Sequence, residues 1–329
     1  MSRHDRHPRC LCGLAHSHPF TDAANLVRLK EQNVEVDVVG VYDSDASQAD
    51  IFAERFACTA ASTLEALITL DADLFIVTAR PHEITVYAET LLRETSEPLF
   101  FNKVVAANHT QLTNWIAAID SAPERVGTAS VLRFAPRVRE LAEQITGAEI
   151  WGLRILVQHD IAMFLAEDRR WQDDPELGGG TLVTVGTHAW EIVDQLLPQA
   201  TLASSAHGWI HHALNSASSS EETAQLTGSL VTPEGESVRF ALTVTGTPGP
   251  EVYAVDVFTS TGTQSLILSS ANTHDSLGFV ELADELVRNA QLGRTTAPWN
   301  SAQTIVANTI HAALTLREFH RTEKSSRND

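Results

Sequence analysis

The feature that most constrains this chain is a regular alternation of short apolar runs and helix-like segments over its first 120 residues. The apolar runs are rich in Val, Leu, Ile and Phe, as buried strands are, and they cover residues 9–14, 34–42, 74–77 and 99–101. Between and after them, apolar residues recur at helical spacing near residues 19–27, 49–56, 64–68, 81–94 and 109–119. Such alternation predicts a parallel sheet that helices cover on both faces.

The pattern changes after Pro123. Strand-like segments at 126–134 and 150–158 precede a helical segment at 181–197, a β-rich stretch at 201–268 and two final helical segments near 276–292 and 301–319. We therefore expect an α/β protein in two domains. An N-terminal Rossmann-type domain with a doubly wound parallel sheet would span residues 1–122. An α+β domain with an open, mostly antiparallel sheet would span residues 123–329.

The charge balance excludes several classes of partner. The 329 residues include 42 acidic and 23 basic side chains, for a formal charge of −19. Such a surface repels phosphate backbones and anionic lipid, so we expect neither a nucleic-acid nor a membrane partner. No apolar run reaches the roughly 18–20 residues that a membrane-spanning helix needs.

Cysteine and histidine usage gives no sign of a metal site. Cys10, Cys12 and Cys58 are too few for a disulfide framework or a four-ligand zinc site, and free thiols indicate a reducing, cytoplasmic compartment. His207 and His211 would face one side of a strand, but no nearby carboxylate or thiol completes a zinc set. We therefore predict no metal.

The first strand is followed by a turn that partly matches a dinucleotide-binding fingerprint. That fingerprint has glycine at positions 13, 15 and 18, and here only Gly13 is a glycine. Ala15 adds one methyl group, whereas His18 adds a whole ring. A helix that begins near Pro19 would still favour an anion at its N-terminus. His16 and His18 either contact phosphate there or only fill the turn.

Asp43 closes the second predicted strand, about 30 residues after Gly13. A carboxylate at this place accepts hydrogen bonds from the adenosine ribose hydroxyls and repels a 2′-phosphate. This position favours NAD over NADP, although NADP stays possible. The alternative is that Asp43 only begins the next helix, since Ser44 and Asp45 follow it.

Three later segments carry motifs in a fixed order. They read Ile-Val-Thr-Ala-Arg-Pro-His at 76–82, Phe-Phe-Asn-Lys-Val-Val at 100–105, and a stretch at 171–188 that contains three consecutive glycines and ends in Val-Gly-Thr-His. Together, and with Arg-Phe-Ala-Pro at 133–136, they resemble the Gfo/Idh/MocA oxidoreductase family, which includes relatives of glucose–fructose oxidoreductase and inositol dehydrogenase. The likeness covers nearly the whole chain.

The resemblance assigns roles to particular residues. In the family, the lysine of a Glu-Lys-Pro motif lies beside nicotinamide and substrate; Lys103 matches this lysine, with Asn102 and Val104 in place of the Glu and Pro. A second family motif, three glycines and then Asp-x-Gly-x-His, matches the glycines at 178–180, Gly186 and His188, but Thr184 replaces its Asp. The turn from Thr78 to His82 resembles a third motif beside the nicotinamide ribose.

The same residues are chemically sensible without the family. Oxidising an alcohol needs a base within hydrogen-bond reach of the hydroxyl group. A partly desolvated lysine and a histidine both meet that need near neutral pH, so Lys103 and His188 form a candidate catalytic pair. The alternatives are a solvated loop lysine and an ordinary helix-start histidine, with residues 178–180 only a flexible loop.

Further residues are candidates for substrate contact. His159 and Asp160 follow a strand that should end at the cleft, and Trp171 would wall the pocket unless its loop is exposed. Thr184 and His188 complete the predicted substrate residues, and Gly13, Ala15, His16, His18, Asp43, Thr78, His82 and Lys103 are the predicted cofactor residues.

The leading interpretation is an NAD(P)-dependent oxidoreductase that acts on a sugar, a polyol or a similar cyclic alcohol. The resemblance also implies a homodimer or homotetramer formed through the open sheet. Two other interpretations stay open. The four departures at Ala15, His18, Asn102 and Thr184 fit a non-catalytic binding or regulatory protein. Alternatively, the cofactor assists an elimination or epimerisation.

Overall fold

The first half of the chain forms the expected parallel sheet. The computed structural model describes residues 7–212 and 218–328. Its first sheet contains β1 (Pro8–Cys12), β2 (Asp37–Tyr42), β3 (Thr59–Ala60), β4 (Leu74–Val77), β5 (Leu99–Asn102) and β6 (Val126–Ala129). All of its neighbouring strands are paired in parallel, in the order β3-β2-β1-β4-β5-β6. The strand order reverses beside β1, where doubly wound sheets bind ligands.

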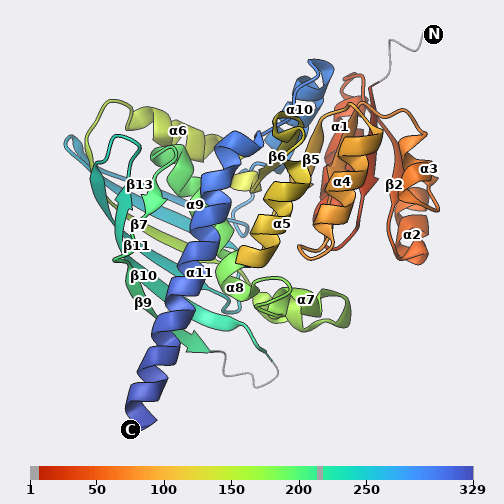
Figure 1. The fold of residues 1–329 in the computed structure, drawn as a ribbon. Helices are drawn as coiled ribbons and strands as arrows, with labels where there is room; N and C mark the ends of the chain where they lie inside the picture. Colours follow the sequence, from red (N-terminus) through yellow and green to blue (C-terminus); the bar gives the residue numbers. More distant parts are fainter. Residues whose placement is uncertain (1–6, 213–217, 329) are drawn as a thin grey trace. The chain divides into compact units, whose positions relative to one another are not determined.

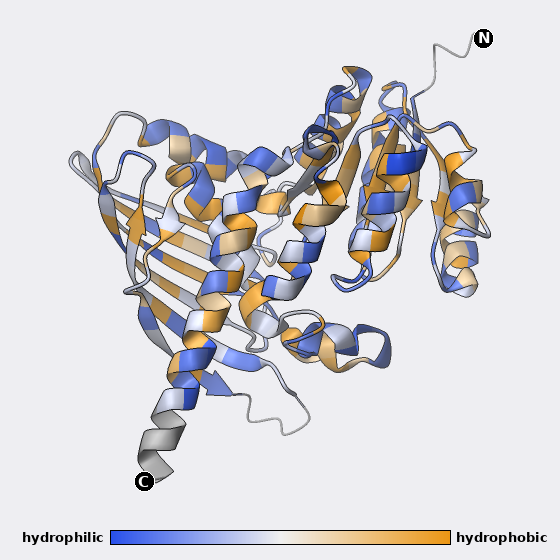
Figure 2. Ribbon diagram, in the orientation of Figure 1, coloured by the Kyte–Doolittle hydropathy of each residue, from blue (hydrophilic) through white to orange (hydrophobic). Residues whose placement is uncertain are grey.

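The helices of this half follow from local sequence signals. They are α1 (His18–Glu31), α2 (Ala46–Phe56), α3 (Leu64–Ile68), α4 (Ile84–Glu94) and α5 (His109–Ile119). Pro19 lies in the first turn of α1, where its missing N–H costs no hydrogen bond. Asp45 caps α2, because its side chain accepts a hydrogen bond from the Ser47 N–H. Figure 2 shows the mainly hydrophobic strands and the mixed colouring of these helices.

Contacts within the chain define two compact units, and the first includes residues from far along the sequence. It consists of the residues up to Val105, Thr110–Ala129 and Phe279–Ala302. Its late segment contains α10 (Phe279–Gln291), which packs on α1. The sequence led us to expect a boundary at residue 122; β6 and α10 both lie beyond it.

The second unit contains a seven-stranded sheet. Its strands are β7 (Ile150–Gln158), β8 (Thr201–Leu202), β9 (His207–His212), β10 (Glu221–Val231), β11 (Ser237–Thr245), β12 (Val252–Thr259) and β13 (Gly262–Ser269). Their order is β13-β12-β7-β11-β10-β8, and β9 pairs with β10. The β7–β11 pair is parallel and the other described pairs are antiparallel, which confirms a mostly antiparallel sheet.

Helices of the second unit lie on one face of this sheet (Figure 1). They include α6 (Pro136–Gln144), α8 (Gly180–Thr184), α9 (Gly186–Leu196) and α11 (Trp299–Asn328), whereas the short helix α7 (Arg170–Asp173) packs on α8 away from the strands. Side chains on β7 alternate as expected, since Leu153, Ile155 and Val157 are buried and Arg154 is exposed.

Two segments differ from the sequence-based expectation. The strand predicted at 126–134 ends at Ala129, and Val131–Phe134 forms a 3-10 turn because the Ser130 hydroxyl accepts the Leu132 N–H. The helix predicted at 181–197 is interrupted at Val185, between α8 and α9.

Cys10 and Cys12 are buried free thiols and Cys58 is a half-buried one. Among the described residues, no helix is both long enough and apolar enough to cross a membrane.

Candidate functional site

The turn after β1 requires the glycine that the sequence retains. Gly13 has φ +76°, and a Cβ atom at this position would lie 2.6 Å from the carbonyl oxygen of Thr78. The Gly13 N–H donates to the Tyr42 carbonyl (2.7 Å), and the Ala15 N–H donates to the Thr78 carbonyl (3.1 Å). The turn is thereby fixed to the ends of β2 and β4. Any larger residue at position 13 would separate these backbones.

Asp43 lies beside the same turn. Its carboxylate accepts the Leu14 N–H at 2.5 Å and the Asp45 N–H at 2.8 Å. Asp45, rather than Asp43, caps α2. A carboxylate accepts about four hydrogen bonds, so these two leave capacity for hydroxyl donors. Asp43 therefore both holds the turn and presents negative charge beside it.

The two histidines of the turn contact each other. The rings of His16 and His18 are perpendicular, with their centroids 4.5 Å apart, and His18 also packs edge-on against Phe279 at 5.3 Å. The His18 N–H donates to Nδ1 of His16 at 3.3 Å. These contacts show that the rings fill the turn. Whether they also contact phosphate stays a prediction.

A buried polar cluster joins three elements of the first unit. The side-chain amide of Asn102 donates to the Asp22 carboxyl at 2.9 Å and to the Thr78 hydroxyl at 2.8 Å. Burial raises the pKa of Asp22 to about 7, and the hydrogen bond from Asn102 opposes this rise. Asp22 was not predicted as a functional residue, although an acidic residue beside an apolar stripe is a possible signal.

Lys103 directly follows this cluster at the end of β5, and the Lys103–Val104 peptide bond is cis. Thr78 directly follows β4 and is buried. His82 lies four residues later, with Nε2 3.6 Å from a carboxylate oxygen of Glu83. The first unit thus carries all of the predicted cofactor residues, and four of them directly follow strands β1, β2, β4 and β5: Gly13, Asp43, Thr78 and Lys103.

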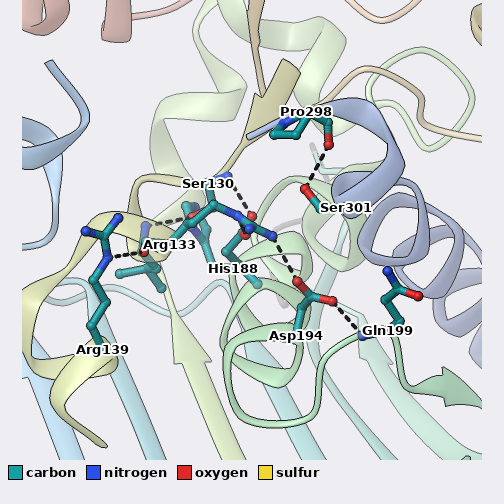
Figure 3. A network of polar contacts seen from close by, with 10 residues as sticks. Ser130, Arg133, Arg139, His188, Asp194, Gln199, Pro298 and Ser301 are labelled. Atoms are coloured by element: carbon teal, nitrogen blue, oxygen red, sulfur yellow. Dashed lines mark hydrogen bonds and ion pairs between the residues drawn. The ribbon is translucent and has the colours of Figure 1, made fainter. Parts of the chain in front are cut away.

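In the second unit, His188 lies in the first turn of α9 and is buried. Its Nδ1 lies 2.6 Å from the hydroxyl oxygen of Ser130 (Figure 3). The Ser130 backbone N–H donates to Glu191 on the same helix, at 2.9 Å. Glu191 accepts from Arg133 at 2.5 Å, and Arg133 also donates to Asp194 at 2.9 Å.

Burial raises the pKa of Glu191, and the Arg133 guanidinium opposes the rise. The same two carboxylates, Glu191 and Asp194, raise the pKa of Arg133 against the effect of its burial. This buried ion pair ties α9 to the turn that begins at Ser130. The local sequence patterns do not reveal this ion pair, because its partners Arg133 and Glu191 lie 58 residues apart.

A second histidine stacks on His188. The ring of His159 lies 4.9 Å from that of His188 with an interplanar angle of 22°. Nε2 of His159 lies 2.7 Å from the hydroxyl of Tyr253, whose ring is 5.4 Å from His188. Glu251 lies 3.9 Å from Nδ1 of His159. Burial raises the pKa of Tyr253 well above its usual range, so its phenol stays protonated. Tyr253 and Glu251 were not predicted from the sequence.

The three consecutive glycines occupy positions where larger side chains do not fit. A Cβ at Gly178 would lie 2.3 Å from the Trp171 carbonyl, and one at Gly179 would lie 2.4 Å from Val183. A Cβ at Gly180 would lie 2.9 Å from a carboxylate oxygen of Glu221. Gly179 and Gly180 also have positive φ angles. This loop is packed closely.

The remaining predicted substrate residues belong to the same unit. Thr184 is buried, and its hydroxyl donates to the Gly180 carbonyl one turn earlier, at 2.6 Å. Trp171 is largely buried, so its loop does not expose it to solvent. Asp160 caps the 3-10 turn Ile161–Leu165 by accepting the Ala162 N–H.

Metal-binding side chains do not cluster in the described part of the chain. Within residues 7–212 and 218–328, no group of three or more His, Cys, Asp or Glu side chains is arranged to hold a metal ion. His207 and His211 lie on β9, and Nε2 of His211 is 3.5 Å from Glu222.

Comparison of the sequence with family models and with curated proteins gives no match. Comparison of the fold with solved structures gives many. The dehydrogenase WlbA from Bordetella pertussis, solved with NADH and UDP-GlcNAcA, has a TM-score of 0.75 and 14% identity, over 95% of this chain and 97% of that one. GenD2 from gentamicin A biosynthesis, solved with NAD, has a TM-score of 0.73 and 17% identity, over 96% of this chain and 94% of that one.

A myo-inositol dehydrogenase from Corynebacterium glutamicum is similar over 97% of both chains, with a TM-score of 0.72 and 13% identity. The chain therefore has the fold of the Gfo/Idh/MocA-type dehydrogenases, as the motifs predicted. These likenesses extend over nearly full length, so both units have counterparts in those enzymes.

Proposed function

We propose that this protein is an NAD(P)-dependent oxidoreductase that acts on a CH–OH group of a sugar, a polyol or a similar cyclic alcohol. The observation that carries the proposal is the turn after β1, where Gly13 packs against Thr78 and Asp43 accepts the Leu14 N–H. The turn lies at the strand reversal of the sheet, where doubly wound folds bind dinucleotides. The fold likeness to dehydrogenases that were solved with NAD or NADH supports it.

The residues around this turn suit a dinucleotide. Gly13 and Ala15 would let the backbone approach a pyrophosphate, with the N-terminus of α1 and the imidazoles of His16 and His18 beside it. Asp43 would accept the adenosine ribose hydroxyls, which favours NAD. Bound NAD supplies the hydride acceptor for the oxidation of an alcohol carbon.

Thr78, His82 and Lys103 would lie toward the nicotinamide half of the cofactor. Lys103 would accept the proton of the substrate hydroxyl, and His188 would hold the substrate oxygen. The remaining substrate contacts would come from His159, Asp160, Trp171 and Thr184. The packing of His159 and Tyr253 around His188 supports this assignment, because it gathers polar groups at one end of the sheet.

A second candidate function is a binding or regulatory protein without turnover. The observation that favours it is His18, whose ring stands at the third glycine position of the fingerprint and packs against Phe279. A side chain of this size reduces the space beside the pyrophosphate. Ala15, Asn102 and Thr184 are the other departures from the pattern.

Cofactor titration followed by a substrate panel tests both candidates. Intrinsic fluorescence is followed while NADH or NADPH is added, and turnover is then measured over inositols, hexoses, hexuronic acids and nucleotide sugars. Saturable NADH binding with turnover of one class is expected. Saturable binding without turnover would favour the binding protein. Failure of both cofactors to bind would contradict the oxidoreductase proposal.

The proposal includes a homodimer or homotetramer formed through the outer face of the second sheet. Phe258 on β12 and Ile267 on β13 are 40% and 62% exposed on that face. Exposed apolar side chains on a sheet favour association. Light scattering during size-exclusion chromatography measures the mass, and charged replacements at both positions should lower it. A monomeric mass for the unaltered protein would contradict this part of the proposal.

A further inference from the structure

The hydroxyl group of Ser130 lies between a backbone donor and an imidazole. Ser130 begins the 3-10 turn after β6, and its side chain is buried. Its Oγ accepts the Leu132 N–H at 3.2 Å and lies 2.6 Å from Nδ1 of His188. Figure 3 shows the Ser130 side chain pointing toward His188.

A hydrogen-bond inventory fixes the direction of the contact with His188. A serine hydroxyl has one proton to donate and two lone pairs that accept. The Leu132 N–H uses one lone pair. Within residues 7–212 and 218–328, Nδ1 of His188 is the sole acceptor within hydrogen-bond distance of this hydroxyl. A buried hydroxyl proton without an acceptor is destabilising, because it has lost its hydrogen bond to water and gained none in return. The proton of Ser130 therefore points at Nδ1.

The backbone of Ser130 is fixed independently by the same helix. Its N–H donates to one carboxylate oxygen of Glu191, three residues after His188 on α9. The other carboxylate oxygen of Glu191 accepts from Arg133. Both oxygens of Glu191 therefore have donors other than the imidazole, and the carboxylate does not compete with Ser130 for His188.

We infer that Ser130 is the positioning residue of His188: its hydroxyl donates to Nδ1 and holds the imidazole neutral, with the proton on Nε2. The catalytic meaning of this inference rests on the proposed function. A neutral imidazole with a proton on Nε2 donates a hydrogen bond and does not act as a base there. His188 then donates to the substrate oxygen, and Lys103 alone takes the proton. The sequence did not decide which of the two residues is the base. The tautomer of His188 assigns that role to Lys103 and makes His188 the hydrogen-bond donor.

The titratable groups around His188 agree with a neutral ring. His159 stacks on it at 4.9 Å, so two positive charges in this stack would repel each other. Tyr253 stays protonated because burial raises the pKa of its phenol. The carboxylates of Glu191 and Asp194, on the helix that carries His188, are both paired with Arg133. Glu251 lies near Nδ1 of His159, at 3.9 Å.

Nitrogen-15 spectroscopy of histidine-labelled protein tests the inference without any substrate. The His188 signals are identified by their absence from the spectrum of His188→Gln. We expect Nδ1 of His188 to be unprotonated and Nε2 to carry the proton, between about pH 6 and 9. A proton on Nδ1, or an imidazolium form over this range, would overturn the inference, whatever the variants do.

Variants of Ser130 provide the second measurement. Ser130→Ala should produce a mixture of the two tautomers or allow His188 to become protonated, and Ser130→Thr should restore the original state because it retains the hydroxyl. Thr63→Ala is the matched control, since it also removes a cap hydrogen bond, to the Ala66 N–H, and touches no histidine. A His188 spectrum unchanged in Ser130→Ala would contradict the positioning role.

Kinetics then separate this inference from the proposed function. With a substrate that turns over, Ser130→Ala should lower kcat by roughly 10–100-fold, the range seen when the hydrogen-bond partner that fixes the tautomer of a metal-bound histidine is removed. It should leave NADH affinity unchanged and should add a new protonation step to the pH–rate profile. If no substrate turns over, the proposed function fails, but the tautomer of His188 is still measured.

Discussion

Asn102 donates a hydrogen bond of 2.9 Å to the carboxyl group of Asp22, which lies 80 residues earlier in the chain. Asp22 is buried on the inner face of α1, and Asn102 also donates to Thr78. One side-chain amide thus connects a helix with the ends of two neighbouring strands. The resemblance would place a glutamate at position 102. In this chain the carboxyl group of the cluster comes from α1 instead.

The first prediction concerns stability and pH. The pKa of Asp22 is raised by burial from its ordinary value of 3.8 to about 7, so the folded state binds a proton more tightly than the unfolded state. The contribution of Asp22 to stability is therefore greatest below about pH 4 and declines as the pH rises to about 7. Asp22→Asn keeps an acceptor for Asn102 and has no such titration.

Chemical denaturation at pH 5 and pH 8 measures this difference. Relative to the original protein, Asp22→Asn should gain on the order of 1–3 kcal/mol of unfolding free energy between the two pH values. The contributions of the other titrating groups to the pH dependence cancel in this comparison, because both proteins contain these groups. Equal pH dependence of the two proteins would contradict a raised pKa at Asp22.

The second prediction is that Asp43 selects NADH over NADPH. Asp43→Asn keeps an oxygen for the Leu14 N–H and removes the charge, whereas Asp43→Ser removes the charge and shortens the side chain. Both variants should narrow the ratio of the two dissociation constants by about tenfold, equivalent to about 1.4 kcal/mol. Tighter binding of NADPH than of NADH by the original protein would show that the assignment of Asp43 is wrong.

The third prediction concerns Lys103. Lys103→Ala should lower kcat by about 10²–10⁴-fold, the usual effect of losing a general base. Lys103→Met is a matched variant that keeps most of the aliphatic chain and should be equally slow. The melting temperature should change little, because Lys103 lies at a strand end. A variant that turns over the best substrate at the original rate would exclude Lys103 as the base.

The fourth prediction uses Thr184. An aspartate here would introduce a negative charge near the reacting groups and stabilise their protonated forms. Thr184→Asp should therefore shift the pH–rate profile toward higher pH. Thr184→Asn has the same size and no charge, and both variants lose the hydroxyl bond to the Gly180 carbonyl. If the two variants give the same profile, residue 184 does not face the reacting groups.

The fifth prediction tests the packing of the glycine loop. Gly179 and Gly235 have nearly equal φ angles of +89° and +87°, but a Cβ would meet Val183 at Gly179 and nothing within 4 Å at Gly235. Gly235→Ala should lower the free energy of unfolding by about 1 kcal/mol, from backbone strain alone. Gly179→Ala should lower the free energy of unfolding by about 1–3 kcal/mol more than Gly235→Ala, because its methyl group also clashes with the Val183 side chain. Equal melting temperatures for the two variants would mean that the loop at residues 178–180 rearranges to accommodate the methyl group at little energetic cost.

Local patterns in the sequence were sufficient for most of the fold. The apolar runs placed β4 and β5 to within one residue, and the helix predicted at 109–119 matches α5. Alternation of strands and helices predicted the parallel sheet, because each crossover needs a helix. The motifs also predicted the fold shared with the Gfo/Idh/MocA-type dehydrogenases.

Contacts between distant residues were not predictable in this way. Ser130 lies 58 residues from His188, and only the folded chain brings them together. The strand predicted at 126–134 ends early because the Ser130 hydroxyl caps a turn. The apolar residues of this segment indicate burial but do not distinguish a strand from such a turn. The role of Asp22, on α1, is not predictable for the same reason, because it depends on Asn102, which lies 80 residues later on strand β5.

The return of the chain to its first unit has a consequence for synthesis. Residues after Phe279 complete that unit: Thr295 donates to the Leu99 carbonyl at 2.9 Å, and the Thr128 N–H donates to the Ala297 carbonyl at 3.0 Å. On the ribosome, these bonds of the N-terminal sheet can form only after residues 279–302 have been synthesised. Until then, the apolar surface of α1 that packs on α10 is exposed to solvent. A stalled or truncated product would present this surface to chaperones and proteases.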